Sequence, residues 1–385
     1  MKINVVVGGR FQVAQTYHAL VSAGHNVHLY TSSPKSYFCS IPNSKLTFVP
    51  KPAQIAQKTF RVRMPRLLSE WNAIWFDTVV AGVMRSADVV WGFNGDSLSC
   101  GRKIKRLGGS YVVDRACPHF DYQQEILAQE AENIGYRYAE FSDRMSRRFN
   151  SEYAIADKIV VPSRYSFESF VERGYPRDKL CIAPLDSNAP APSDKTTGNK
   201  KRDDGGSLVV GLVGGSYLRK GIIYLLRAID QLENGNIVVR IRATPKNVLS
   251  HKEGKMLCDR LGVEFVPYVE DINDFYQGLD VFVLPSIDEG FGMVAYEALA
   301  NGIPLIASTN VGAIDGFVPD KDILVFPAGD SNGLATLINR LFKDPAFRHA
   351  LGKAGHAAYV NRMSAGANYS SVVDELIESL RQAKV

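Results

Sequence analysis

Short apolar segments alternate with longer amphipathic ones along most of the chain. Strands are predicted where apolar residues run without interruption, and helices where they recur every three or four positions. In the first half the predicted strands are residues 2–7, 26–30, 88–91, 110–114 and 158–161. Helices are predicted at residues 12–23 and along a polar stretch from about 122 to 156. Fully apolar strands separated by helices indicate a parallel sheet that is covered by helices on both faces.

The same pattern restarts after a break. Residues 189–206, APAPSDKTTGNKKRDDGG, contain no large apolar side chain, which predicts a linker between domains. Beyond it the predicted strands are residues 207–213, 237–243, 264–266, 281–284 and 305–307, and the predicted helices are 222–232, 293–300 and from 332 onward. The chain is therefore expected to be α/β, with two doubly wound, Rossmann-like domains (1–188 and 207–365) facing each other across a ligand-binding cleft.

Composition supports an ordinary globular protein. Hydrophobic residues make up 45% of the 385 residues and charged residues 22%, close to average values. No apolar run approaches the roughly 20 residues that span a bilayer, and the apolar start is too short for a signal-peptide core, so a cytoplasmic location is expected. The five scattered cysteines show no C-x-x-C spacing and suggest neither a zinc site nor a disulfide framework.

Positive charge is concentrated in one segment. Residues 58–115 contain ten Lys and Arg against five Asp and Glu, an excess of five, which equals the formal charge of +5 on the whole chain. That total is too modest to indicate a nucleic-acid partner. The alternation of basic and apolar residues at 60–68 favours peripheral contact with an anionic membrane or an anionic acceptor. A solvated basic face beside a buried helix is the structural alternative.

A glycine-rich segment is the sharpest feature of the sequence. Residues 288–302 read DEGFGMVAYEALANG and follow a predicted strand. Gly290 and Gly292 leave the backbone bare where a helix begins, so the N–H groups around Phe291 and Met293 can bind an anion at the positive helix end.

Two carboxylates belong to the same segment. Glu289 lies in the loop before the predicted helix, and Glu297 lies just over one turn inside it. Because carboxylates accept hydrogen bonds from hydroxyls, one can bind a sugar ring and the other a ribose in the same cleft. Two solvated surface glutamates are the structural alternative, but two glycines and an acid in one strand-end loop favour a ligand site.

A second glycine turn carries two cations. Gly215 and Ser216 follow the strand 207–213, and Arg219 and Lys220 stand where the next helix begins. A lysine as a point charge and an arginine as a fork suit a diphosphate. The dinucleotide fingerprint G-x-G-x-x-G is not matched.

Three residues of the first domain are candidates for the opposite wall of the cleft. His119 follows the strand 110–114, and Gly8 and Gly9 end the first strand. A lone histidine after a strand is often structural, but this position favours a functional role. The glycines let the backbone approach a donor phosphate or an acceptor, or they serve only the turn.

Taken together, these motifs resemble a known family. Glu289 and Glu297, separated by seven residues in EGFG…E, resemble the E-x7-E signature of the retaining glycosyltransferases with the GT-B fold, family 4, the glycosyl transferases group 1. Residues 5–34 with their GG turn, ADKIVVPS at 156–163 and RLFKDPAFRHAL at 340–351 are also similar to family segments. The resemblance covers nearly the whole chain.

The resemblance implies roles for individual residues. Lys220 is expected to neutralise the diphosphate of the donor, and Arg219 to supply a second charge, because Gly215 stands where the family has an arginine. His119 is expected beside the reacting sugar, and these three with Glu289 are the predicted catalytic residues. The nucleotide base is expected near Val266 and Tyr268. A helix at about 366–385 is expected to pack back on the first domain.

The implied reaction transfers a hexose-type sugar, with retention, from a UDP- or GDP-linked donor to a saccharide or lipid-linked acceptor. A place in bacterial surface polysaccharide or glycan synthesis is expected. No metal is expected, since two cations and helix N-termini can stabilise a diphosphate leaving group. The only D-x-D triplet, residues 320–322, lies in a late loop with no apolar strand directly before it.

The sequence is also compatible with two rival functions. A nucleotide-sugar epimerase can share this fold and would need no acceptor. A non-catalytic nucleotide-sugar-binding partner subunit is kept open by the arginine missing at Gly215. A glycogen-type phosphorylase is disfavoured by the chain length and by the lack of a cofactor-lysine element.

Overall fold

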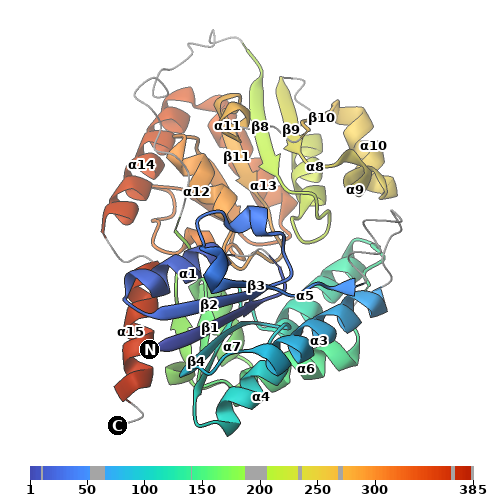
Figure 1. Cartoon of the computed structure of the whole chain (residues 1–385). Helices are drawn as coiled ribbons and strands as arrows, with labels where there is room; N and C mark the ends of the chain where they lie inside the picture. Colours follow the sequence, from blue (N-terminus) through green and yellow to red (C-terminus); the bar gives the residue numbers. More distant parts are fainter. Residues whose placement is uncertain are drawn as a thin grey trace.

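Two parallel sheets form the centres of two stacked layers of the molecule (Figure 1). The structure is a computed structural model of the 385-residue chain and describes residues 1–9, 12–52, 66–139, 141–186, 206–232, 236–267, 272–365 and 369–382. The predicted linker falls outside the described residues except for Gly206, and so does the basic, apolar stretch 60–68 up to residue 65.

The first sheet has seven strands in the order β3-β2-β1-β4-β5-β6-β7, and all of its pairings are parallel. The strands are β1 (Lys2–Val7), β2 (Asn26–Thr31), β3 (Leu46–Phe48), β4 (Val89–Phe93), β5 (Ser110–Asp114), β6 (Lys158–Val161) and β7 (Leu180–Ile182). Its helices are α1 (Val13–Ser22), α3 (Arg66–Val83), α4 (Leu98–Arg106), α5 (Phe120–Asn133), α6 (Asp143–Ile155) and α7 (Arg164–Val171).

Alternation along β1 explains why helices cover both faces of this sheet. Ile3, Val5 and Val7 belong to the apolar core on one face, while Val6 belongs to the core on the other. Successive side chains of a strand point to opposite faces, so an uninterrupted apolar strand must be buried on both.

The second sheet has six strands in the order β10-β9-β8-β11-β12-β13, again all parallel. The strands are β8 (Leu208–Val213), β9 (Ile237–Arg242), β10 (Glu264–Phe265), β11 (Val281–Leu284), β12 (Leu305–Ser308) and β13 (Leu324–Phe326). Its helices are α8 (Ile222–Gln231), α9 (Pro245–Leu249), α10 (Lys252–Leu261), α11 (Ile272–Gln277), α12 (Met293–Ala300), α13 (Ser331–Lys343) and α14 (Pro345–Ser364).

Two long helical stretches are divided in the structure. The segment predicted as helical from 122 to 156 forms α5 and α6, which are separated after Asn133 by a turn in which Gly135 takes a φ of 63°. The stretch after residue 332 forms α13, α14 and a last helix, α15 (Tyr369–Gln382). A proline at the start of α14 separates it from α13, since proline is tolerated at the first turn of a helix but not in its interior.

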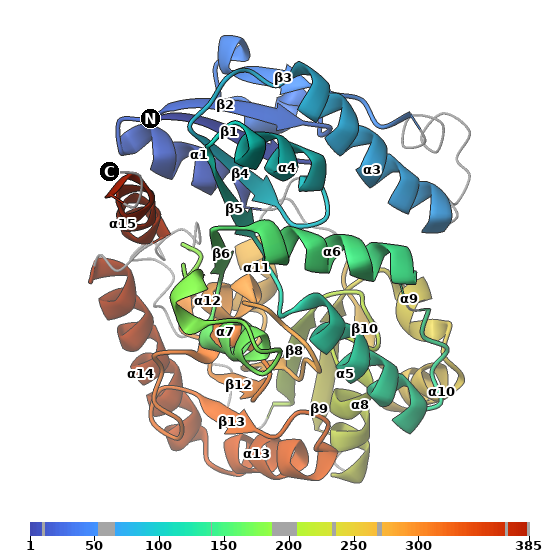
Figure 2. The ribbon, with the colours of Figure 1, turned by 90° about the horizontal axis from the view of Figure 1, so that it is seen from below.

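The last helix, α15, lies against the first sheet's domain, beside α1 (Figure 1 and Figure 2). Its apolar face, with Val373 and Ile377, is buried in the same core as α1. The Tyr369 hydroxyl lies 2.7 Å from the Thr16 hydroxyl and donates to the buried Asp114 carboxylate at 2.9 Å. The chain therefore crosses between the two layers twice.

No helix in the described part of the chain is long and apolar enough to cross a bilayer.

Candidate donor-binding site

The two glycine segments lie side by side because they follow neighbouring strands. β8 and β11 are paired in the second sheet, and residues 214–221 and 285–292 leave at their carboxyl ends. Gly221 takes a φ of 60°, and a Cβ atom there would lie 1.9 Å from the Pro285 carbonyl oxygen. Only glycine allows this approach, because both the left-handed backbone and the contact exclude a side chain. The Ile287 N–H donates to the Arg219 carbonyl at 2.9 Å and joins the two segments.

This approach brings three predicted residues together. The Lys220 ammonium donates a short hydrogen bond to the Glu289 carboxylate, and the Arg219 guanidinium lies 3.4 Å from its other oxygen. The side chains of Lys220 and Glu289 are 9% and 11% exposed, and that of Arg219 is 33% exposed. Burial alone would raise the pKa of Glu289, but the two cations outweigh it and lower that pKa. Glu289 is therefore an anion held between two cations.

The other residues of the segment 285–292 lie around the start of α12. Gly292 takes a φ of 98° as the residue before Met293, and Phe291 is buried. Glu297 is not part of the cation cluster: it accepts a hydrogen bond of 2.8 Å from the Tyr276 hydroxyl on α11.

The remaining donor-side candidates have simpler surroundings. Gly215 is half-buried beside Asn247, and Ser216 is exposed in the turn after β8. Val266 is half-buried, and its N–H donates to the Ile241 carbonyl at 2.9 Å. Tyr268 lies outside the described residues.

His119 is not brought to this cluster. Its side chain packs against the rings of Tyr153, Phe170 and Tyr175, with centroids 5.0, 5.0 and 5.4 Å away. The residue is 2% exposed, and neither ring nitrogen has a hydrogen-bond partner. Burial lowers the pKa of His119 to about 4, so the ring is neutral at pH 7. In this arrangement the imidazole is enclosed by aromatic side chains, and no contact among the described residues joins it to the Lys220–Glu289 pair, so its place beside a sugar stays a prediction.

His119→Phe is expected to leave turnover within a few-fold of wild type, because a phenyl ring fits an aromatic enclosure and leaves no buried nitrogen unsatisfied. The variant should also flatten the pH dependence of stability. The native state resists protonation while the unfolded state binds a proton below about pH 6.5, so wild-type stability falls as pH drops from about 6.5 to 4. Urea unfolding at several pH values and initial rates of donor turnover check both effects. Loss of turnover in a folded His119→Phe protein would restore the catalytic role.

Contacts from the first domain close over the loop that carries Glu289. The Ser163 hydroxyl donates to the Gly290 carbonyl at 2.6 Å. A Cβ atom at Gly290 would lie 2.3 Å from the Ala116 carbonyl oxygen and 2.6 Å from the Cys117 Cα, both after β5 of the other sheet. Gly290 is therefore needed because the two domains touch there.

Asp288, for which no role was predicted, lies at the same contact between the domains. Its carboxylate is buried and accepts hydrogen bonds from the Gln123 side chain and, at 3.2 Å, from the Tyr165 hydroxyl. Burial raises the pKa of Asp288, although the hydrogen bond from Gln123 acts to lower it. Both partners come from the first domain, so Asp288 joins the domains next to the cation cluster. In the sequence, the signal for this role of Asp288 is its position directly before Glu289.

Gly290→Ala is expected to reduce transfer by about a hundredfold, because a misplacement near 1 Å in the site costs this much. Gly290 does not have a positive φ, so the added methyl acts through the clash with Ala116 and not through backbone strain. Initial rates measure the loss. The matched control is Gly82→Ala on α3, where a Cβ meets nothing within 4 Å. Equal rates for Gly290→Ala and wild type would show that the domains need not touch there during turnover.

On the opposite side, Gly8 and Gly9 end β1 and line a pocket of the first domain together with Lys51 and Asp96. Within the described ranges, no group of three or more His, Cys, Asp or Glu residues is placed to hold a metal ion.

Comparison with known proteins agrees with this geometry. Residues 194–358 match the model of the family described as glycosyl transferases group 1. The capsular polysaccharide biosynthesis glycosyltransferase CapM of Staphylococcus aureus is 29% identical over 178 residues, which are 45% of this chain and 46% of that protein. The chain spans about half the length of the curated relatives that it matches.

Solved structures match over the whole chain. Sucrose-phosphate synthase from Thermosynechococcus elongatus has a TM-score of 0.70 at 22% identity, covering 100% of this chain and 99% of that one. Anabaena HepE in complex with UDP has a TM-score of 0.67 at 16% identity, covering 99% and 100%. The predicted GT-B fold is thus confirmed, and the resemblance to the group 1 glycosyltransferases is confirmed over residues 194–358.

Proposed function

We propose that the protein is a retaining glycosyltransferase of family 4 that moves a hexose-type sugar from a UDP- or GDP-linked donor to a saccharide or lipid-linked acceptor. The observation that carries this proposal is the convergence of Lys220 and Arg219 on Glu289 at the carboxyl ends of β8 and β11. Two cations beside a helix start form a site for a diphosphate, and a carboxylate beside them is a site for sugar hydroxyls.

The chemistry follows from the charges. When the bond between the anomeric carbon and the diphosphate breaks, negative charge grows on the leaving oxygen. Lys220 and Arg219 stabilise that charge, together with the N–H groups around Gly292 and Met293. The sugar becomes positively charged and is attacked by an acceptor hydroxyl, whose proton passes to the leaving diphosphate oxygen. Because both cations contact Glu289, a bound diphosphate competes with this carboxylate, which is then released toward the sugar. No step needs a metal ion.

Two relatives support the choice of substrates. HepE has been solved in complex with UDP, which favours a UDP-linked donor here. CapM is named for capsular polysaccharide biosynthesis, which favours a role in bacterial surface glycans.

The proposed location is the cytoplasm, with peripheral contact at an anionic membrane through the basic segment 58–115. Exposed aromatic residues on α3 support this contact. Trp71 and Trp75 are 44% and 40% exposed and stack at 5.6 Å, and Leu68 on the same helix is 45% exposed. Tryptophan side chains favour the membrane–water interface. Flotation with vesicles that contain anionic lipid, compared with neutral vesicles, tests this part separately.

A thermal-shift screen against UDP, GDP, ADP, CMP and their common sugar conjugates tests the donor site. A nucleotide at a hundredfold its Kd adds about 2.7 kcal/mol of stability, enough for a clear shift. A response to UDP or GDP that is lost in Glu297→Ala supports the proposal. No response to any of these ligands would contradict it. Retention is tested by determining the anomeric configuration of the product.

A further inference from the structure

The pocket lined by Gly8 and Gly9 lies in the first domain, at the carboxyl ends of β1 and β4. It has a volume of about 270 Å³ and lies between α3 and α6. β1, β4 and β5 are neighbours in the sheet, and β5 leads to Ala116 and Cys117, which lie against Gly290 of the donor loop. The pocket is therefore on the edge of the first sheet that faces the donor site.

An ion pair forms one wall of this pocket. The Lys51 ammonium lies 3.1 Å from the Asp96 carboxylate, and their side chains are 8% and 11% exposed. The other Asp96 oxygen accepts a hydrogen bond of 2.8 Å from the Gly8 N–H. A Cβ atom at Gly8 would lie 2.1 Å from Lys51 Nζ, so the bare glycine makes room for the pair.

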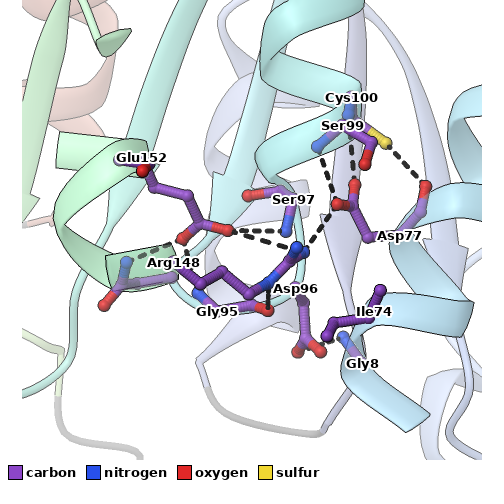
Figure 3. Close-up of polar contacts among 12 residues, drawn as sticks. Gly8, Ile74, Asp77, Gly95, Asp96, Ser97, Ser99, Cys100, Arg148 and Glu152 are labelled. Atoms are coloured by element: carbon purple, nitrogen blue, oxygen red, sulfur yellow. Dashed lines mark hydrogen bonds and ion pairs between the residues drawn. The ribbon is translucent and has the colours of Figure 1, made fainter. Parts of the chain in front are cut away.

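The loop that carries Asp96 is held by side chains of α6, which lies beside it (Figure 3). The Glu152 carboxylate accepts hydrogen bonds from the N–H groups of Gly95 and Ser97 at 2.5 and 3.0 Å. Arg148 donates to the Gly95 carbonyl at 2.8 Å and pairs with Asp77 at 2.6 Å. These contacts fix the backbone on both sides of Asp96, so its carboxylate has a defined position.

The charges in the described lining of the pocket are balanced: one lysine faces one aspartate. Among its described lining residues Lys51 is the only cation, and it is paired with Asp96. Arg148, just behind the loop, is paired with Asp77 and lies 3.9 Å from Glu152. Among the described residues, the pocket therefore holds one cation for one carboxylate, whereas the donor cluster holds two cations, Lys220 and Arg219, for the single carboxylate of Glu289.

The opposite wall is apolar. Phe149 of α6 lines the pocket and stacks on Phe120 with ring centroids 4.1 Å apart. Gly95 has a φ of 93°, and a Cβ atom there would lie 2.9 Å from the Phe149 ring. An aromatic wall opposite a carboxylate–ammonium pair suits a ring that has apolar C–H groups and hydroxyls.

We propose that this pocket binds an uncharged, hydroxyl-rich ring of the acceptor, and that Asp96 and Lys51 select it over a phosphorylated one. This inference rests on the proposed transferase function and names the class of its acceptor. A hydroxyl donates to Asp96 and accepts from Lys51 at the same time, whereas a phosphate brings up to two negative charges next to Asp96. Asp96 thus acts as a specificity-determining residue.

Transfer and donor hydrolysis, measured as release of nucleoside diphosphate, test the inference with the donor that responds in the thermal-shift screen. The acceptor probes are D-glucose and myo-inositol, each compared with its phosphorylated counterpart, glucose 6-phosphate and inositol 1-phosphate. We expect the uncharged probes to raise the rate above hydrolysis and the phosphorylated ones to leave it unchanged.

Asp96→Asn should then raise the KM of the uncharged probes by about tenfold, because hydrogen bonds to a charged carboxylate are lost, while the KM of the donor stays unchanged. The matched control is Asp88→Asn, an exposed aspartate just before the opposite end of β4. The inference is overturned if phosphorylated probes are the better acceptors, if no uncharged probe raises the rate, or if Asp96→Asn leaves their KM unchanged. Donor hydrolysis that persists in any of these outcomes leaves the proposed function standing.

Discussion

Lys220→Ala is expected to reduce sugar transfer by about a thousandfold. The ammonium of Lys220 is the more buried of the two cations that contact Glu289, and loss of one such stabilising donor costs about 10²–10³ in rate. Alanine also leaves Glu289 buried with Arg219 as its remaining cation, so repulsion between this carboxylate and the diphosphate adds to the loss. Initial rates of nucleoside-diphosphate release and the thermal shift with the same nucleotide measure the two effects.

Lys255→Ala is the matched control for Lys220→Ala, because Lys255 is an exposed lysine on α10 of the same domain. It should keep wild-type rates and the wild-type nucleotide response. Full activity in a folded Lys220→Ala protein would remove the proposed diphosphate site, and full nucleotide binding with no transfer would confine the role of Lys220 to the reaction step.

Arg148→Met is expected to destabilise the first domain by about 3–5 kcal/mol, the usual cost of removing one partner from a buried ion pair. Arg148 is 8% exposed, and its removal leaves the carboxylates of Asp77 and Glu152, both with 0% exposed side chains, without their cation. The three tryptophans of the chain, Trp71, Trp75 and Trp91, all lie in this domain, so urea unfolding followed by tryptophan emission reports on it.

Arg147→Met gives the control for this substitution, because Arg147 is exposed on the same helix. Its expected effect is within about 0.5 kcal/mol. An Arg148→Met protein as stable as Arg147→Met would mean that water reaches the network shown in Figure 3.

The sequence predicted best those strands that are buried on both faces. Residues 110–114 and 281–284 were predicted with the bounds that β5 and β11 have, because an apolar run bounded by polar residues has clear ends. Three edge strands, β3, β7 and β13, were missed, since each has only three residues and shows too little pattern to be recognised. Edge strands in native sheets are often kept short, which limits pairing with other chains.

The site was predictable where it depends on local geometry. Lys220 and Glu289 follow neighbouring parallel strands, so their meeting at one edge of the sheet follows from the fold class. The direction of the His119 ring does not follow in this way, because side chains of α6 and of the segment around α7 decide it. The Lys51–Asp96 pair escaped for a similar reason: it joins residues after different strands, and neither residue lies in a recognisable motif.

The position of α15 has a consequence for how the chain folds during synthesis. The first domain needs α15 to complete the core that it shares with α1, while the second sheet and its helices end at Ser364, before α15 begins. Domains usually fold in the order in which they leave the ribosome. Here the second sheet and its helices emerge before α15, so the core that α15 shares with α1 is completed after the second domain. Until then the apolar face of α1 is uncovered, so chaperone binding is expected at the amino-terminal domain rather than at the carboxyl-terminal one.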